Sequence, residues 1–136
     1  MKKIPTYLAV VAVALIDEDG RVLMQRRRSG AQHGGLWEFP GGKVELAETL
    51  VSALLREIEE ELALTLAADD VQWLARAVDA DGGVVIDLYT CRRWPGVPQC
   101  LDAEAIAWFA PDRLADLAMP PLDIPLARAV RELLQS

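Results

Sequence analysis

Residues 41–64 read GGKVELAETLVSALLREIEEELAL, and this stretch decides the fold. Its second half combines a regular apolar spacing with a dense run of acidic residues. The apolar residues recur at intervals of three and four and so form one stripe along a helix: they are Ala47, Leu50, Val51, Leu54, Leu55, Ile58 and Leu62. The pattern predicts an amphipathic helix that begins near Ala47 and packs its apolar face on a core.

Four glutamates crowd the polar side of this helix, at Glu57, Glu59, Glu60 and Glu61. An acidic run on a helix is most often a solvated surface. Here Glu57, Glu60 and Glu61 stand at i, i+3 and i+4, so their carboxylates project from neighbouring points of one face. Like charges at this spacing repel each other, and a divalent cation turns the repulsion into coordination. Mg²⁺ prefers such oxygen ligands and often bridges them to substrate phosphates, so the spacing predicts a Mg²⁺ site.

The segment that precedes the helix, Pro40-Gly41-Gly42-Lys43, is expected to be a tight loop. Glycine allows the backbone to come close to a ligand or a metal ion. The segment is not a Walker phosphate loop, because it lacks both the spacing and the Ser or Thr after the lysine.

The sequence on both sides of this stretch alternates between strand-like and helix-like patterns. An Asp-Gly step at residues 17–20 predicts a hairpin between the first two strands. Pro111 suggests the first turn of a short helix. Asp123 can cap a C-terminal helix that carries Leu126, Val130 and Leu133 on one face. Strand-like runs cover residues 7–16, 21–25, 71–78, 84–93 and 106–109. This order predicts an α/β or α+β fold, one domain over residues 1–136, with helices on both faces of a mixed sheet.

Composition and charge exclude several classes of protein. The chain has 136 residues, 52% of them hydrophobic, and a net charge of −7. This charge argues against a duplex nucleic-acid binder, which would carry a basic surface. The apolar run near the N-terminus leads directly into the predicted hairpin, which favours a buried strand over a signal peptide. No run is long enough to span a membrane. Cys91 and Cys100 have no CxxC spacing and are expected to be reduced thiols of a cytoplasmic protein.

The acidic helix and the glycines before it resemble the Nudix box. The resemblance covers Gly42, Glu48, the pair Arg56-Glu57 and the helix end up to Leu64, residues 42–64 in all. One fixed position departs from the family pattern, because Ala63 stands where the family has glycine. Glycine usually relieves a left-handed turn at a helix end, so the departure concerns the local geometry there and leaves every carboxylate in place.

The resemblance implies the Nudix fold, an α/β/α sandwich with a central mixed sheet, and a Mg²⁺ cofactor for which Mn²⁺ can substitute. It places Glu57, Glu60 and Arg56 in the catalytic group, with Glu57 orienting or deprotonating the attacking water. Glu48 would support the site through a salt bridge to Arg56. The implied metal ligands are the Gly41 carbonyl, Glu57, Glu60, Glu61 and a late acidic residue, for which Glu104 is the first candidate and Asp102 the second.

Further segments resemble the MutT-like branch of the family: Arg26-Arg27, residues 36–45 and Pro120–Pro125. Such enzymes hydrolyse a nucleoside triphosphate to the monophosphate and pyrophosphate. The branch implies a substrate like 8-oxo-dGTP and a role in sanitising the nucleotide pool, as in DNA repair. A sister group that acts on CTP or modified pyrimidine triphosphates is the alternative. A Nudix-fold module that binds a nucleotide without hydrolysing it is a third, weakened because such modules usually lose box carboxylates.

By the same resemblance, Arg26, Phe39, Lys43 and Asp123 form the substrate-binding group. Phe39 would pack on the base, and Arg26 would contact the nucleotide. Asp123 stands where the 8-oxoguanine enzyme has Asn and would read the base edge. An ionised Asp only accepts hydrogen bonds, which suits a cytosine amino group or the N–H edge of guanine. Asp123 as a helix N-cap is compatible with this role. The small-molecule nucleotide is the expected partner, and monomer and homodimer remain open.

Overall fold

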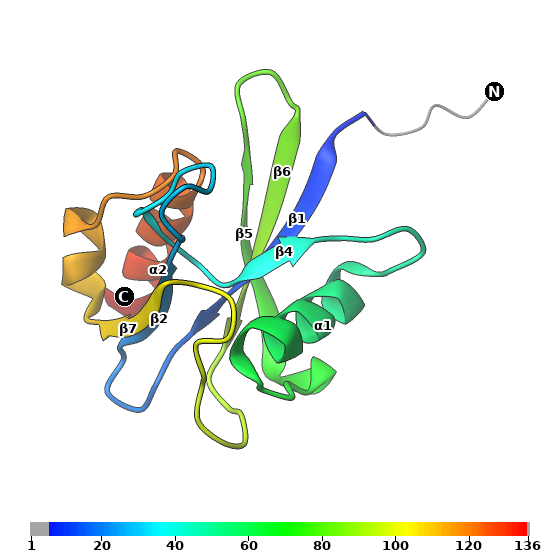
Figure 1. Cartoon of the computed structure of the whole chain (residues 1–136). Coiled ribbons are helices and arrows are strands. Elements are labelled where there is room, and N and C mark those ends of the chain that lie inside the picture. Colours follow the sequence, from blue (N-terminus) through cyan, green and yellow to red (C-terminus); the bar gives the residue numbers. More distant parts are fainter. Residues whose placement is uncertain (1–5, 136) are drawn as a thin grey trace.

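A computed structural model describes residues 6–135. Figure 1 shows a central group of strands with one long helix on each side. The strands are β1 (Leu8–Leu15), β2 (Val22–Arg26), β3 (Trp37–Glu38), β4 (Gly41–Lys43), β5 (Val71–Val78), β6 (Val84–Cys91) and β7 (Ala105–Phe109). The helices are α1 (Leu50–Leu62) and α2 (Asp123–Gln135), with two short 3₁₀ helices, η1 (Ala68–Asp70) and η2 (Pro111–Asp116).

The strands form two sheets. One has the order β4-β1-β6-β5 and is mixed, because β1 runs parallel to β6 and antiparallel to β4. The other is antiparallel, with the order β3-β2-β7. Together with the flanking helices this is the α/β arrangement with a mixed sheet that the sequence predicts. The parallel pairing of β1 with β6 brings together segments about 75 residues apart in the chain, which strand propensity alone does not specify.

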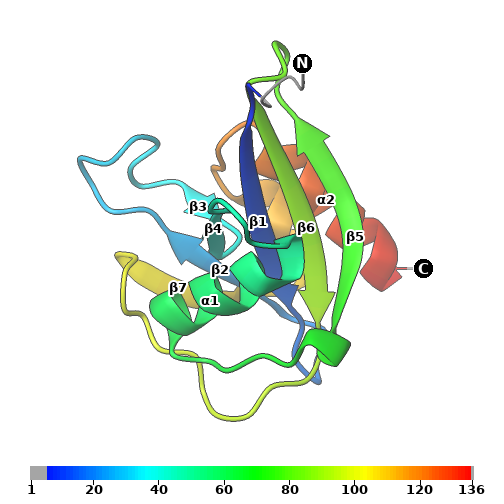
Figure 2. The same cartoon turned by 90° about the vertical axis from the view of Figure 1, so that its right-hand side faces the viewer.

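Strand β1 lies at the centre of the fold and has a helix on each face (Figure 2). Val11, Val13 and Leu15 are fully buried in a cluster with α1, whereas Ala12 and Ala14 belong to a second cluster with η2 and α2. The alternation follows from the period of two along a strand. Because both faces are buried, the strand reads as a continuous apolar run.

The predicted first hairpin is only partly right. The turn is present, since the Gly20 N–H donates to the Asp17 carbonyl and Gly20 has a φ of 77°. The strands that leave the turn share one bridge, Ile16 with Val22, and then enter different sheets. The second strand therefore pairs with β3 and β7 instead of β1.

Helix α1 begins later than predicted. Ala47 has a φ of 69°, which is outside the helical region. The N-cap is Thr49, whose hydroxyl accepts the Ser52 N–H while the Ser52 hydroxyl accepts the Thr49 N–H. Such reciprocal capping satisfies two donors that the first turn leaves unpaired. At the other end, Ala63 adopts the left-handed conformation (φ 56°, ψ 34°), and its N–H donates to the Glu59 carbonyl. The glycine-like helix end is thus kept without glycine.

The expected tight loop at residues 40–43 is instead the edge strand β4. Gly41, Gly42 and Lys43 pair with Ala12, Val11 and Val10 of β1. Both glycines allow a close approach: a Cβ on Gly41 would meet the backbone of β1, and a Cβ on Gly42 would meet the Glu57 side chain.

The C-terminal part also differs in detail. The segment that starts at Pro111 is a 3₁₀ helix, and Pro111 is in its first turn as expected. Helix α2 starts at Asp123 itself and buries Leu126, Ala127 and Val130. Leu134, not Leu133, packs on the core next to them, while Leu133 is 37% exposed.

The two cysteines and the lengths of the helices bear on two further predictions. Cys91 is buried and Cys100 is exposed, and both are free thiols. Among residues 6–135, no helix has the length and apolar character needed to cross a membrane.

Candidate active site

Helix α1 lies directly against the glycines of β4. A Cβ placed on Gly42 would come within 2.3 Å of both Cδ and Oε2 of Glu57. A Cβ on Gly41 would come within 1.9 Å of the carbonyl oxygen of Val11. Both distances are far below van der Waals contact, so the two glycines allow the strand, β1 and the acidic helix to meet.

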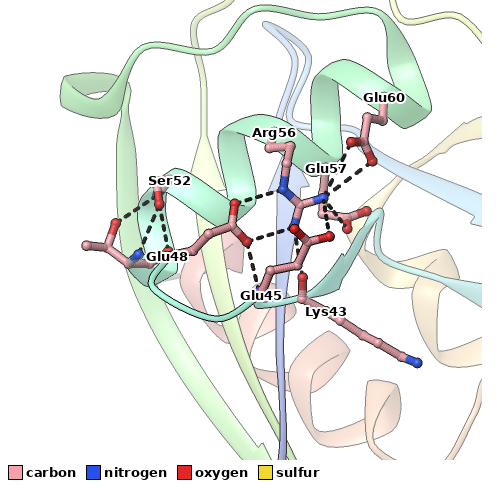
Figure 3. A network of polar contacts seen from close by, with 8 residues as sticks. Lys43, Glu45, Glu48, Ser52, Arg56, Glu57 and Glu60 are labelled. Carbon is pink, nitrogen blue, oxygen red and sulfur yellow. Dashed lines mark hydrogen bonds and ion pairs between the residues drawn. The ribbon is translucent and has the colours of Figure 1, made fainter.

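The guanidinium of Arg56 is the centre of a polar network on α1 (Figure 3). It binds Glu48 with two hydrogen bonds of 2.8 Å, from Nε and Nη2. Its Nη2 also donates to the Lys43 carbonyl at 3.0 Å, and its Nη1 to Glu57 at 2.9 Å. Glu60 lies farther away, with an Nη1–Oε2 distance of 3.4 Å. Arg56 therefore joins the loop before α1, strand β4 and the acidic face of α1, and it pairs with Glu48 as the resemblance implied.

Hydrogen bonds hold the Glu48 carboxylate in its ionised form. The two bonds from Arg56 are the main cause, and the Glu45 N–H adds a third at 2.8 Å. Together they lower the pKa of Glu48 to about 2.

Glu61 is in a different environment from the other glutamates of α1. Its Oε2 accepts the Gly41 N–H at 3.1 Å and the Gln25 side-chain amide at 3.3 Å. Burial, followed by the nearby negative charges of Glu57 and Asp102, raises the pKa of Glu61 to about 8 despite these two donors. Its carboxylate is thus short of positive charge, in contrast to that of Glu48.

Among residues 6–135, no three acidic, histidine or cysteine side chains converge closely enough to enclose a cation. The donor set nevertheless fits a hard divalent cation. Glu57 and Glu61 repel each other across the face that meets Gly41 and Gly42, and a cation between them would remove the repulsion that raises the Glu61 pKa. The N–H and C=O of one strand residue point to the same edge, so the Gly41 carbonyl lies on the side of its N–H, towards Glu61.

The structure brings together Glu104 and Arg26, for which the resemblance implied different roles, metal binding and nucleotide contact. Arg26 Nε lies 3.4 Å from Glu104 Oε2, and the Ser29 hydroxyl donates to the other carboxylate oxygen at 3.4 Å. Asp102, the second candidate for the late metal ligand, acts on Glu61 through its charge. Its carbonyl also accepts a hydrogen bond from Arg28 Nε.

A cavity of about 620 Å³ opens beside this site. Three of the expected substrate-binding residues, Phe39, Lys43 and Asp123, line it together with Gly41 and Gly42. Arg26 is not among the lining residues. One wall is apolar and comes from β1, β6 and the segment before α2: Leu8, Val10, Val84, Ile86, Pro120, Pro121 and Leu122.

Asp123 is buried and is one of the residues that line this cavity. Its Oδ2 accepts the Phe39 N–H at 3.1 Å, which ties the start of α2 to the segment between β3 and β4. The hydrogen bond thus reaches across the fold and not to the first turn of α2, where an N-cap would act. Burial, followed by the charge of Glu38, raises the pKa of Asp123 to about 7 although the Phe39 N–H opposes this.

Sequence reasoning missed the polar residues beside Asp123. Arg27 lines the cavity in place of Arg26, and its Nη1 donates to both carboxylate oxygens of Glu38 at 2.9 Å. Burial raises the pKa of Glu38 against this pairing. His33, an exposed loop residue, also lines the cavity. Arg27 directly follows β2, which ends at Arg26, and a period of two along the strand predicts that neighbouring residues face opposite sides.

Comparison with known proteins decides the family. The NUDIX domain model matches residues 6–133. The chain belongs to the Nudix family. It is a Nudix pyrophosphohydrolase of the MutT-like kind, an enzyme whose family acts on nucleotides and typically uses a divalent metal ion. This sets aside the alternative of a Nudix-fold module that only binds.

Three relatives show the range of Nudix enzymes that the chain resembles. A CTP pyrophosphohydrolase of Escherichia coli (strain K12) is 33% identical over 121 residues, 88% of this chain and 88% of that protein. An 8-oxo-dGTP diphosphatase of the same organism is 27% identical over 124 residues, 90% of this chain and 96% of that protein. A structure from work on MutT of Aliivibrio salmonicida and Vibrio cholerae superposes with a TM-score of 0.83 at 26% identity, covering 93% of this chain and 98% of that chain.

Proposed function

We propose that this protein hydrolyses a nucleoside triphosphate to the nucleoside monophosphate and pyrophosphate with the help of Mg²⁺. The observation that carries the proposal is a juxtaposition: the carboxylates of Glu57 and Glu61 lie against Gly41 and Gly42, which also line the cavity of about 620 Å³. A polyphosphate bound along this segment would connect a base in the cavity to the acidic helix.

In the proposed reaction, water attacks a phosphorus of the triphosphate, and the anhydride bond between the monophosphate and the pyrophosphate breaks. A cation held by these residues would neutralise the charge of the polyphosphate. Glu57 orients the water and accepts its proton, and its position against Gly42 restricts the carboxylate to one side of the helix. Arg56 donates hydrogen bonds to Glu57 at 2.9 Å and to Glu48 at 2.8 Å, so it fixes Glu57, the proposed general base, relative to strand β4.

The proposed ligands of Mg²⁺ are the side chains of Glu57, Glu60 and Glu61 together with the Gly41 carbonyl. Mn²⁺ is expected to substitute for Mg²⁺. Glu104 remains the proposed late ligand. Asp102 is supported as its competitor, because its charge acts on Glu61 whereas Glu104 is paired with Arg26.

For the base, we propose an edge that presents a donor and an acceptor side by side. A pKa of about 7 means that the Asp123 carboxyl is neutral in part of the molecules near neutrality, and a neutral carboxyl both donates and accepts. This supports an 8-oxo-dGTP-like substrate and a role in sanitising the nucleotide pool. CTP or a modified pyrimidine triphosphate is the second candidate, favoured by the 33% identity to a CTP pyrophosphohydrolase.

Pyrophosphate release tests both statements. The wild-type protein with Mg²⁺ is assayed on dGTP, 8-oxo-dGTP, CTP and 5-substituted pyrimidine triphosphates. We expect Glu57→Gln to lower turnover by orders of magnitude, while Glu59→Gln, the same change on the exposed side of α1, leaves it near the wild-type value. Near-normal activity of Glu57→Gln in a folded protein removes Glu57 from the catalytic role. Absence of pyrophosphate release from the whole panel overturns the proposed reaction.

A further inference from the structure

A buried glutamine lies beside the acidic helix, and its side-chain oxygen has no hydrogen-bond donor among residues 6–135. Gln25, on β2, is 4% exposed. Its Nε2 donates to Glu61 Oε2 at 3.3 Å. Its Oε1 is the buried side-chain oxygen for which residues 6–135 supply no hydrogen-bond donor. Buried polar groups nearly always have a partner, so this oxygen points to a donor that the protein itself does not provide.

The surroundings of Gln25 explain why the protein supplies no donor. Glu38 lies directly opposite Gln25 in the β2–β3 pair, and Glu61 faces it from α1. Both neighbours are carboxylates, which accept hydrogen bonds when ionised. The amide N–H₂ donates to Glu61, and Gln25 also lowers the pKa of Glu38. A cation between Glu57 and Glu61 would keep Glu61 ionised, and an ionised carboxylate only accepts hydrogen bonds, so Glu61 would then have nothing to donate to the carbonyl end.

A hydrated cation supplies the missing donor. Mg²⁺ keeps several of its waters when it binds to carboxylates, and a water polarised by a cation is a strong hydrogen-bond donor. Groups behind the direct ligands commonly orient them and are needed for full metal affinity. We propose that Gln25 is a positioning residue of the cation site: its Nε2 holds Glu61 in place, and its Oε1 accepts a hydrogen bond from a water of the bound cation. This inference rests on the cation site of the proposed function.

The test measures cation binding without nucleotide and without turnover. Mn²⁺ is titrated into the full chain, and free Mn²⁺ is followed by electron paramagnetic resonance. Gln25→Met keeps the length of the side chain and removes both polar ends. Gln25→Glu removes the donor and keeps an oxygen acceptor. Thr90→Val is the matched control, because Thr90 is also buried and polar on a strand but donates to the Gln72 carbonyl, away from the acids.

We expect Gln25→Met to weaken Mn²⁺ binding by roughly tenfold or more, the size of effect typical of groups behind the direct ligands. The Mn²⁺ affinity of Gln25→Glu should be no more than a few-fold weaker than that of the wild type. The Mn²⁺ affinity of Thr90→Val should match the wild type. Wild-type affinity in Gln25→Met overturns the proposal. Equal weakening in Gln25→Met and Gln25→Glu also overturns it, because loss of the donor to Glu61 would then account for the whole effect.

A measurement on the wild-type protein keeps the test decisive if the variants do not fold. The side-chain amide of Gln25 is followed by NMR during a Mg²⁺ titration, and its carbonyl carbon and N–H₂ signals should shift as the site fills. Unchanged signals at saturating Mg²⁺ overturn the proposal. The function is judged separately: normal hydrolysis with Mn²⁺ binding independent of Gln25 overturns this inference alone, whereas Gln25-dependent binding without hydrolysis of any nucleotide overturns the proposed reaction alone.

Discussion

The carboxylate of Glu57 occupies the space that a side chain at position 42 would need. An added Cβ on Gly42 would lie 2.3 Å from Glu57 Oε2 and 2.6 Å from its Oε1. The glycine of the Nudix box therefore does more than permit a bend in the chain. It determines how closely Glu57, the proposed general base, approaches strand β4 and the cavity that Gly42 lines.

Gly42→Ala should push the Glu57 carboxylate out of its place while the strand pairing persists. We expect turnover to fall by about 100-fold, since a displacement near 1 Å in an active site can have an effect of that size. The measurement is kcat together with the thermal unfolding temperature. Gly83→Ala is the matched control, because a Cβ there meets the flexible Asp81 carboxylate at 3.1 Å. A folded Gly42→Ala protein with wild-type kcat would refute the tight placement of Glu57.

The Glu48–Arg56 pair predicts how stability depends on pH. The folded pKa of Glu48 is about 2, below its ordinary value of 4.5, chiefly because Arg56 donates two hydrogen bonds. A lowered pKa gives stability that is present above pH 4.5 and is lost as the pH falls towards 2. Arg56→Lys should make the loss of unfolding free energy in this window shallower, as measured by urea unfolding at several pH values.

Arg113→Lys serves as the control for that experiment. Its ion pair with Asp116 is long, at 3.6 Å, and both side chains are about 70% exposed, so it should leave the acid limb unchanged. An acid limb of Arg56→Lys that coincides with the wild type would contradict the assigned pairing.

Asp123 should make base selectivity depend on pH. Its pKa is raised to about 7, so the carboxyl is mostly neutral at about pH 6 and mostly ionised at about pH 8. The neutral form donates and accepts, and the ionised form only accepts. We expect the ratio of kcat/KM for 8-oxo-dGTP or CTP to that for dGTP to change between these pH values in the wild type. In Asp123→Asn this ratio should stay flat, and the ranking of bases should shift. An identical pH profile in both proteins would exclude Asp123 as the reader of the base.

Ala63→Gly should stabilise the protein. Ala63 has a φ of 56°, a region where an L-residue with a Cβ is disfavoured by about 1–2 kcal/mol, partly offset by the larger freedom of glycine in the unfolded chain. We expect the free energy of unfolding to rise by about 0.5–1 kcal/mol. Ala67→Gly is the control, because Ala67 is exposed with a φ of −95° and should lose about 0.5–1 kcal/mol. A loss in Ala63→Gly equal to that in Ala67→Gly would refute the strain at the helix end.

The sequence was most informative where one element specified itself. The apolar stripe from Leu50 to Leu62 predicted α1 correctly except for its start. Ala47 fits the apolar spacing, so the spacing could not show that Ala47 has a positive φ and that the helix is capped by Thr49. The parallel pairing of β1 with β6 and the entry of β2 into a second sheet lie beyond such patterns. They depend on which buried faces fit each other across the whole chain.

For the site, rigid spacing was sufficient for the box and insufficient for its surroundings. Glu48 and Arg56 meet as the family pattern implied, and Phe39, Lys43 and Asp123 reach one cavity. Arg27, with its partner Glu38, was missed because neighbouring arginines look alike in sequence and only the strand phase separates them. Gln25 had no signal at all, since a single polar residue at a strand end is ordinary.

Carboxylates from two different helices hold the same short piece of backbone. The Phe39 N–H donates to Asp123 of α2, and the Gly41 N–H, two residues later, donates to Glu61 of α1. In the proposed mode of binding, the backbone from Phe39 to Gly41 keeps a fixed distance between the site of the nucleobase and the site of the polyphosphate. Nucleotides with different bases would then present the same anhydride bond to the water. The backbone would then determine which anhydride bond is hydrolysed. Substitutions in the cavity lining could change which bases are accepted without changing which bond breaks.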